Sequence, residues 1–407
     1  MDYVIVGGSI AAASGLAAVR RNLPGAEIRV VADEPLPFYY RPLIPYLLDG
    51  SRTAEEILFT EHPSTISGVD LLHDQCVAVN SEKRLISLKS GRELAYKKLL
   101  LAAGGAPELL LPHLAGAESG GVFTLRSLDD AARIRRHLLR GCKAAAVIGG
   151  GLVGIKAAEA LLRAGLAVTV IEQQPHILPL RADAFAADAV ADRLRQQGMS
   201  ILTEDAPVEI MTAAGQAVGV RLASGRTAAA DLVLLAAGVK PNIAFLAQSG
   251  ITIERGVVVD QQMRTSVPDI YAAGDLMQFT DQADGSAAVS GLWSNAVCSG
   301  RVAGCNMSGG KAVAPPMLAV MNSTEIAGLP LLSAGLLKGT AGQHEVVAEA
   351  CGGNYRKLIF EQDRLAGLLF LGKAERAGVY ANLIRCRIPL GGKRDAIVRE
   401  VMAEMKQ

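Results

Sequence analysis

The part of this chain whose residue types and spacing could do chemistry is a glycine-rich turn near its middle. An apolar run that ends at Ile148 breaks into a G-x-G-x-x-G segment and continues as a helical pattern to Arg163. A second apolar run, residues 167–171, follows and stops at Glu172. Strand, glycine-rich turn, helix, strand and acid in this order are typical of a dinucleotide-binding turn. We expect its contacts to the nucleotide at Gly149, Gly151, Leu152, Val153 and Gly154.

Each glycine of this turn has its own expected task. Gly149 permits the tight turn, Gly151 lets the backbone approach a pyrophosphate, and Gly154 lets the helix pack closely on the strand. The pyrophosphate then meets the unpaired N–H groups of the helix start. Glu172 is placed to accept a hydrogen bond from a ribose 2′-OH and would repel a 2′-phosphate, so the pattern favours NADH over NADPH.

The N-terminus repeats this pattern. A strand-like run of residues 3–6 enters a glycine-rich turn and a helical stretch, and a second strand, residues 28–31, ends before two acids. Two dinucleotide folds imply two nucleotides, and hydride transfer between a nicotinamide and a flavin is the simplest chemistry that needs both. The expected contacts to the first cofactor are Gly7, Ser9, Ile10, Ala11, Ala12, Asp33 and Glu34.

The loop of residues 35–50 contains a single cation, Arg41, among prolines and aromatic residues. The prolines favour a loop that leads into a short helix over a strand. Arg41, with Pro42 beside it, would neutralise a cofactor phosphate or a charge near the flavin. The alternative is an exposed arginine on a surface loop.

Small residues follow two apolar strands, at Ala102-Ala103-Gly104 and again at Gly238, where they would let the backbone pass close to a cofactor. A third strand ends at Gly274 and Asp275. Asp275 would bind hydroxyls of a ribityl chain, with a buried capping aspartate as the alternative. Trp293 lies at the start of the next expected helix, whose N-terminus would stabilise negative charge on a reduced flavin.

The repeated strand exits define the expected domains. They predict an α/β protein with two Rossmann-like, three-layer ββα nucleotide-binding domains, the second inserted in the first. The first, FAD-binding domain would comprise residues 1–107 and 237–311, and the inserted NAD-binding domain residues 108–236. Residues 312–407 contain a hairpin pattern followed by a helical one, which predicts a small C-terminal α+β domain.

Composition narrows the function classes. With 407 residues the chain has room for two or three domains, and a formal net charge of +1 argues against nucleic acid as the main partner. No apolar run reaches the roughly 18 residues that a membrane span needs, and the N-terminus has no leader pattern, so we expect a cytoplasmic protein.

The cysteines offer no disulfide or metal pattern. None forms a C-x-x-C motif, and we expect all six to be reduced structural thiols. Cys298 and Cys305 share a helical face but lie roughly 10 Å apart along it, too far for a disulfide. The six cysteines are Cys76, Cys142, Cys298, Cys305, Cys351 and Cys386.

With these residues in view, the chain resembles the FAD-dependent pyridine nucleotide-disulfide oxidoreductase superfamily over nearly its whole length. The resemblance implies FAD in the first fold, NADH in the second and a C-terminal domain that screens the flavin. It also implies that a residue near Val77 receives the adenine through its backbone. The matching motifs are Gly7-x-Ser9-x-x-Ala12, Ala102-Ala103-Gly104, Gly149-x-Gly151-x-x-Gly154, Ala237-Gly238-x-x-Pro241 and Ala273-Gly274-Asp275.

Within that superfamily the chain is most similar to NADH:rubredoxin oxidoreductases and related reductases. The similarity rests on Pro37-Phe38-Tyr39-x-Arg41-Pro42-Leu43, on Lys156 in the second fingerprint and on Tyr380-x-Asn382-Leu383-Ile384-Arg385. It implies that electrons pass from the flavin to a small iron–sulfur protein, a rubredoxin or ferredoxin. The protein would be a monomer or homodimer.

Three residues depart from the superfamily pattern. Ser9 replaces the second glycine of the first fingerprint, and we still expect FAD to bind. Neither the C-x4-C pair of disulfide reductases nor the single redox cysteine of NADH oxidases and peroxidases is present, because the loop carries Leu43-Ile44-Pro45. Lys156 occupies a position where many relatives have a glutamate paired with a lysine, and that lysine position is close to Tyr46. We expect Lys156 to act in catalysis by favouring the reduced flavin or orienting the nicotinamide.

Other functions remain open at this point. The alternatives are an NADH oxidase that reduces oxygen, a reductase component of a larger enzyme such as a nitrite or CO dehydrogenase system, and a flavoprotein whose shape changes when NADH binds. Two basic clusters would dock an acidic partner, although a solvated face is the favoured interpretation of the first. They are Arg133, Arg135, Arg136, Arg140 and Lys143, and Arg385, Arg387, Lys393 and Arg394.

Overall fold

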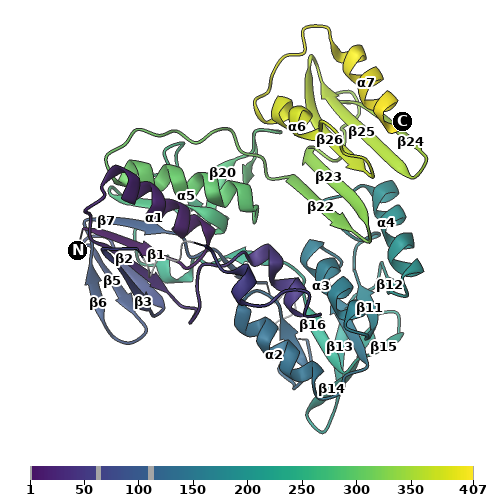
Figure 1. The fold of residues 1–407 in the computed structure, drawn as a ribbon, viewed down its shortest axis with the longest axis horizontal. Coiled ribbons are helices and arrows are strands. Elements are labelled where there is room, and N and C mark those ends of the chain that lie inside the picture. Colours follow the sequence, from purple (N-terminus) through teal and green to yellow (C-terminus); the bar gives the residue numbers. More distant parts are fainter. Residues whose placement is uncertain (1, 61–65, 109–113, 407) are drawn as a thin grey trace.

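The first nucleotide-binding unit has three layers in the computed structural model, which describes residues 2–60, 66–108 and 114–406. A five-stranded parallel sheet, in the order β19-β7-β1-β2-β3, is its middle layer (Figure 1). Its side chains alternate, so that Ile5 faces the helices α1 and α5 and Val4 faces the antiparallel sheet β4-β5-β6. The elements are β1 (Tyr3–Val6), α1 (Ile10–Asn22), β2 (Ile28–Ala32), β3 (Val69–His73), β4 (Cys76–Asn80), β5 (Leu85–Leu88), β6 (Glu93–Ala95), β7 (Lys98–Leu101), β19 (Ile270–Ala272) and α5 (Trp293–Met307).

The second unit repeats this architecture around the parallel sheet β12-β11-β10-β16-β9. Val147 faces the helical layer, and its neighbour Ile148 faces the antiparallel sheet β13-β14-β15. The elements are β9 (Val122–Thr124), α2 (Leu128–Leu138), β10 (Ala144–Ile148), α3 (Leu152–Arg163), β11 (Ala167–Ile171), α4 (Ala184–Gln196), β12 (Ser200–Leu202), β13 (Pro207–Ala213), β14 (Gln216–Leu222), β15 (Thr227–Ala229) and β16 (Leu232–Leu235). The two sheets confirm the predicted α/β class with Rossmann-like folds.

The chain passes between the two units through a small antiparallel pair. Strand β8 (Gly105–Pro107) leaves the first unit and strand β17 (Val239–Pro241) returns to it, with Gly105 opposite Pro241. A Cβ on Gly105 would lie 2.8 Å from the Lys240 carbonyl oxygen, so glycine lets the strands approach. The domain boundaries themselves stay a prediction, and residues 1, 61–65, 109–113 and 407 of the proposed domains lie outside the described part of the chain.

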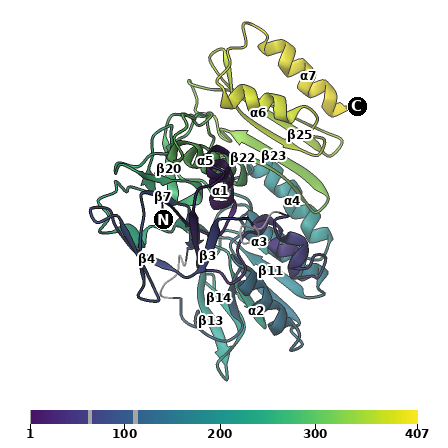
Figure 2. The same ribbon diagram turned by 60° about the vertical axis from the view of Figure 1, so that its left-hand side comes forward.

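The C-terminal region is an antiparallel sheet, β22-β23-β26-β25-β24, covered on one face by two helices (Figure 2). Leu358 and Phe370 face these helices, whereas Leu369 and Leu371 join the core that surrounds α3 and α4. The predicted hairpin is therefore present as β25 and β26. The elements are β22 (Met321–Ile326), β23 (Leu329–Gly335), β24 (Glu345–Cys351), β25 (Asn354–Glu361), β26 (Arg364–Leu371), α6 (Ala377–Arg385) and α7 (Arg394–Lys406).

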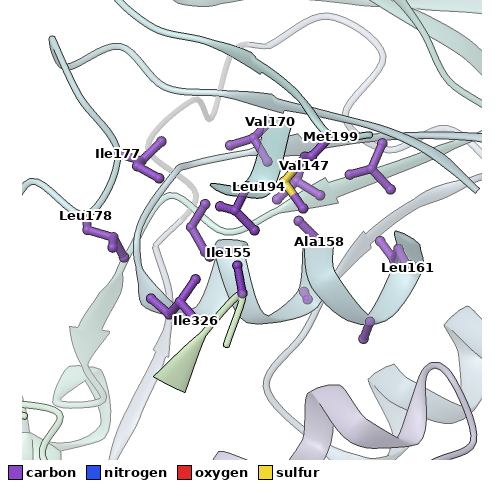
Figure 3. Packing of buried hydrophobic residues seen from close by; sticks show 14 of the residues in the cluster. Val147, Ile155, Ala158, Leu161, Val170, Ile177, Leu178, Leu194, Met199 and Ile326 are labelled. Carbon is purple, nitrogen blue, oxygen red and sulfur yellow. The ribbon is translucent and has the colours of Figure 1, made fainter. Parts of the chain in front are cut away.

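A continuous apolar core joins the second unit to both of its neighbours. Ile155 and Leu161 of α3 belong to the same buried cluster as Ile44 of the first unit and Ile326 of β22 (Figure 3). Ile44 lies in η1, a 3₁₀ helix where the sequence predicts a short helix. The remaining short elements are η1 (Arg41–Leu47), η2 (Glu55–Ile57), η4 (Ala244–Leu246), β18 (Val257–Val258), η5 (Gly274–Leu276), β20 (Met277–Thr280) and β21 (Ala287–Ala288).

None of the helices within the described ranges has the length and apolar character needed to cross a membrane.

Helices α1 and α5 pack closely enough that their contact requires glycine. A Cβ on Gly300 would lie 2.2 Å from the Ala11 carbonyl oxygen. We expect Gly300→Ala to lower the free energy of unfolding by roughly 1–3 kcal/mol, because the helices must separate to admit the methyl group. Gly25→Ala is the control, since a Cβ there has no neighbour within 4 Å. Denaturant unfolding measures both, and equal stability of the two variants would contradict the tight contact.

Candidate functional site

The glycines of the second fingerprint divide into two that the fold needs and one that leaves room for a ligand. Gly149 has φ +108°, and a Cβ there would lie 2.5 Å from the Ala236 carbonyl oxygen at the end of β16. A Cβ on Gly154 would lie 2.0 Å from the Gly149 carbonyl oxygen. By contrast, a Cβ on Gly151 would have no protein neighbour within 4 Å. The surface at Gly151 is thus open beside the start of α3, as a bound pyrophosphate requires.

Glu172 is held firmly at the end of β11. Its Oε2 accepts a hydrogen bond of 2.8 Å from the Gly150 N–H, and its Oε1 accepts one of 2.8 Å from the Gln174 N–H. The side chain is buried beside the glycine-rich turn. This position fits the predicted ribose contact, which stays a prediction.

The first fingerprint has the same geometry. Gly7 has φ +136°, and a Cβ there would lie 2.2 Å from the Ala102 carbonyl oxygen at the end of β7. Ser9 is the residue before α1, and its hydroxyl makes no capping bond to the helix. Instead, its Oγ accepts a hydrogen bond of 3.1 Å from Arg41 Nε. The first N–H groups of α1 thereby remain available to an anion.

Arg41 is the centre of a polar network beside this turn. Its guanidinium forms an ion pair with Glu34 and donates a 2.9 Å bond to the Tyr39 hydroxyl and another of 2.9 Å to the Arg126 carbonyl oxygen. Burial raises the pKa of Tyr39 well above its usual range, so that its hydroxyl stays protonated and donates to Glu34. Arg41 therefore lies next to the first fingerprint but is already paired with an acid. Its contact to a cofactor phosphate stays a prediction.

Arg126 extends this network and was not anticipated from the sequence. Its Nη2 lies 2.9 Å from Asp275 Oδ2, and its Nε donates a bond of 3.1 Å to the Gly105 carbonyl oxygen. Asp275, expected to bind ribityl hydroxyls, thus also holds an arginine that precedes α2. The only sequence signal near Arg126 is the capping box of Ser127 and Asp130, which marks a helix start but not a charge partner.

Aromatic side chains gather at the start of α5. Trp293 stacks on Tyr40 with ring centroids 5.6 Å apart, and Phe59 meets both rings edge-on. Nearby, the Gly274 N–H donates to Ser299 Oγ at 3.0 Å, which fixes the segment that carries Asp275. The three rings thus form an aromatic cluster at the N-terminal end of α5.

The remaining predicted contacts lie at the edges of this region. Asp33 is exposed just after β2, and Val77 is an exposed residue of β4. The others occupy the starts of α1, η1 and α3 or follow β7 and β16, and their cofactor contacts stay predictions. They are Ile10, Ala11, Ala12, Pro42, Leu152, Val153, Ala103, Gly104 and Gly238.

Lys156 lies on the first turns of α3, but its ammonium is directed to the C-terminal region. Its Nζ is 2.7 Å from Glu159 Oε2 and 3.0 Å from the Glu325 carbonyl oxygen, and it lies 5.6 Å from the Tyr46 ring centroid. Lys156 and Tyr46 are thus neighbours. The catalytic role of Lys156 stays a prediction.

The cysteines form no disulfide. All six are free thiols: Cys76, Cys142, Cys298, Cys305, Cys351 and Cys386. In the described part of the chain no three histidine, cysteine or acidic side chains are grouped as a metal site would require.

Substitution of Gly151 separates ligand binding from folding. Gly151→Ala should change the free energy of unfolding by no more than about 0.5 kcal/mol, because the added methyl group meets no protein atom. It should weaken NADH binding about tenfold, since the methyl group occupies the space of the pyrophosphate. Gly149→Ala should instead destabilise the protein by roughly 1–3 kcal/mol. Titration with NADH and denaturant unfolding measure the two effects, and unaltered NADH affinity in Gly151→Ala would contradict the assignment.

Loss of Arg126 tests the polar network. Arg126→Met leaves Asp275 without its cation, so we expect the purified protein to retain less FAD and to lose roughly 1–2 kcal/mol of stability. Arg29→Met is the matched control, because it removes the ion pair of Arg29 with the half-exposed Asp70, which lies in the first unit as Asp275 does. The ratio of flavin to protein absorbance after gel filtration measures retention. Equal retention in both variants would show that the network does not support the cofactor.

Comparison with known proteins agrees with this geometry. A family model described as pyridine nucleotide-disulphide oxidoreductase matches residues 1–300. The NADH-dependent phenylglyoxylate dehydrogenase subunit epsilon of Aromatoleum evansii is 32% identical over 416 residues, which cover 99% of this chain and 97% of that protein. The rubredoxin-NAD(+) reductase of Pseudomonas putida is 33% identical over 282 residues, which cover 68% of this chain and 71% of that protein.

A solved structure has the same fold over the full chain. The covalent putidaredoxin reductase-putidaredoxin complex matches with a TM-score of 0.85 at 25% identity, covering 100% of this chain and 99% of that one. The sequence-based resemblance and the two predicted cofactors are thereby confirmed. The chain belongs to the pyridine nucleotide-disulphide oxidoreductase family and is a flavoprotein oxidoreductase that uses FAD and NADH.

Proposed function

We propose that this protein transfers electrons from NADH, through FAD, to an iron–sulfur protein. The observation that carries the proposal is the pair of equivalent glycine turns, in which Gly7 packs on the Ala102 carbonyl and Gly149 on the Ala236 carbonyl. The loop of residues 35–50, which lies between the two turns in the sequence, contains no cysteine. FAD supplies a two-electron acceptor that can also release electrons one at a time. The protein's own contribution is to bind and orient the two nucleotides, because no side chain has to act as a nucleophile.

The relatives support an iron–sulfur acceptor. One relative is named for rubredoxin, and the solved complex contains putidaredoxin bound to its reductase. In the present chain Leu43, Ile44 and Pro45 occupy the loop where related oxidases carry a redox cysteine. Electrons would therefore leave from the flavin itself.

A second candidate is the NADH-oxidising subunit of a larger enzyme. The similarity to a subunit of phenylglyoxylate dehydrogenase, over 97% of its length, favours this candidate. In such an assembly the iron–sulfur acceptor would be another subunit and not a diffusing protein. The electron path within this chain would be the same.

The two basic clusters differ as docking surfaces. On the C-terminal cluster, Arg394 pairs with Glu345 and Arg387 with Glu361. The cations on and after α2 form no ion pair with any carboxylate of the described residues: they are Arg133, Arg135, Arg136, Arg140 and Lys143. The α2 cluster thus retains its charge for an acidic partner, and Leu139 within it is 88% exposed.

Anaerobic rapid mixing tests the proposed function. The protein reduced with one equivalent of NADH should be reoxidised by rubredoxin or ferredoxin much faster than by oxygenated buffer. The charge reversal Arg136→Glu with Arg140→Glu should slow the reaction with the iron–sulfur protein at low salt and weaken its salt dependence, while reduction by NADH stays unchanged. Fast reoxidation by oxygen alone would make the protein an oxidase and overturn the proposal.

A further inference from the structure

A buried carboxylate, Glu159, joins helix α3 to the tip of the hairpin formed by β22 and β23. The residue is 6% exposed, and both of its oxygens are occupied. Oε2 lies 2.7 Å from the Lys156 ammonium, and Oε1 accepts a bond of 2.8 Å from the Ala327 N–H. Burial of a carboxylate is costly unless it has partners, and here a cation and a backbone donor both contact it.

Lys156 is correspondingly fixed by groups from three parts of the chain. Its Nζ contacts Glu159 on its own helix and the Glu325 carbonyl oxygen of β22, and it faces the Tyr46 ring of η1. The side chain is only 16% exposed. Its charge is therefore compensated chiefly by Glu159 and little by water.

The hairpin tip is shaped to reach Glu159. Ile326 pairs with Leu329, so that Ala327 and Gly328 form the turn, and Ala327 has φ +51°. This left-handed conformation costs an alanine free energy, which its charge-assisted bond to Glu159 offsets. Figure 3 shows Ile326, beside this turn, within the cluster that contains Ile155 of α3.

The attachment of the two regions does not depend on this contact alone. Asp183, before α4, accepts bonds of 2.8 Å from the Tyr355 hydroxyl and from Lys357 Nζ of β25. This second link joins the same two regions without any contact to Lys156. The Glu159 carboxylate is thus one of at least two polar links between the second unit and the C-terminal region, and it is the one that pairs with Lys156.

We propose that Glu159 is a positioning residue that fixes Lys156 and sets the net charge at the start of α3, where NADH binds. The inference rests on the proposed function. The backbone of Lys156 follows that of Gly151 by five residues, or about 7.5 Å along the helix axis, which is within the Debye length of about 8 Å at physiological ionic strength. The backbone of the β22–β23 hairpin contacts both charges, through the Glu325 carbonyl oxygen and the Ala327 N–H. The charge balance therefore depends on the packing of this hairpin against α3.

The test compares Glu159→Gln with Lys156→Gln. Glu159→Gln removes the anion and leaves Lys156 uncompensated, so the flavin midpoint potential should rise and NADH should bind more tightly. Lys156→Gln removes the cation, so both quantities should move in the opposite direction. The double variant should return close to the wild type, and the shifts should shrink as ionic strength rises.

Asp183→Asn is the matched control, because it weakens the other link between the same regions. It should lower thermal stability without shifting the potential or the NADH dissociation constant. The positioning role would be overturned if the flavin midpoint potential moved in the same direction in Glu159→Gln and Lys156→Gln, or moved equally in Asp183→Asn. Glu159 would then have only a structural role. If NADH fails to bleach the flavin of the wild type, the proposed function itself fails. If either single variant does not fold, the double variant Glu159→Gln with Lys156→Gln is the test. A flavin midpoint potential that differs from the wild type in this variant contradicts charge compensation.

Discussion

The close approach of each glycine turn to the end of a neighbouring strand is the constraint on which the rest of the structure depends. Gly7 lies against the Ala102 carbonyl and Gly149 against the Ala236 carbonyl, at distances that no side chain would permit. In both sheets the strand that leads into the glycine turn pairs in parallel with the strand that ends in the small residues. Both sites therefore lie at the carboxyl edge of a parallel sheet, where ligands of such folds bind.

Charge balance at the first site follows from this packing. The side chains of Arg41 and Arg126 are partly buried, with 18% and 27% exposed, so each depends on a partner for part of its stabilisation. Glu34 and Asp275 supply one carboxylate each. Because Arg126 precedes a helix of the second unit whereas Asp275 belongs to the first, the same ion pair also fixes the two units relative to one another.

The features that the sequence could predict are those that depend on residues close together in the chain. The glycine turns, the strand over residues 167–171 and the hairpin of β25 and β26 follow from local periodicity and turn chemistry. The 3₁₀ form of η1, with Pro42 and Pro45 inside it, was predicted only as a short helix. Proline removes the N–H donors that a regular α-helix needs, which explains the difference.

The contacts that could not be predicted join residues far apart in the chain. Arg126 and Asp275 are separated by 149 positions, and Glu159 and Ala327 by 168. No local pattern selects these pairs, because they form only when the sheets and the hairpin of β22 and β23 are packed. Ala327 adds a second difficulty, since alanine rarely adopts the left-handed conformation of its turn, and the compensating carboxylate lies on another element.

The loop that forms η1, residues 41–47, contains no cysteine and is a packing element in this chain. Ile44 and Leu47 of η1 are almost fully buried and share a core with Ile155 and Leu161 of α3. A thiol in their place would require both a cavity and access to the flavin, whereas the apolar side chains fill the contact between the two units. The apolar loop thus stabilises the arrangement of the cofactor sites and leaves no thiol there to store electrons. Under the proposed function, charge and shape at the protein surface would then select the partner that approaches the flavin.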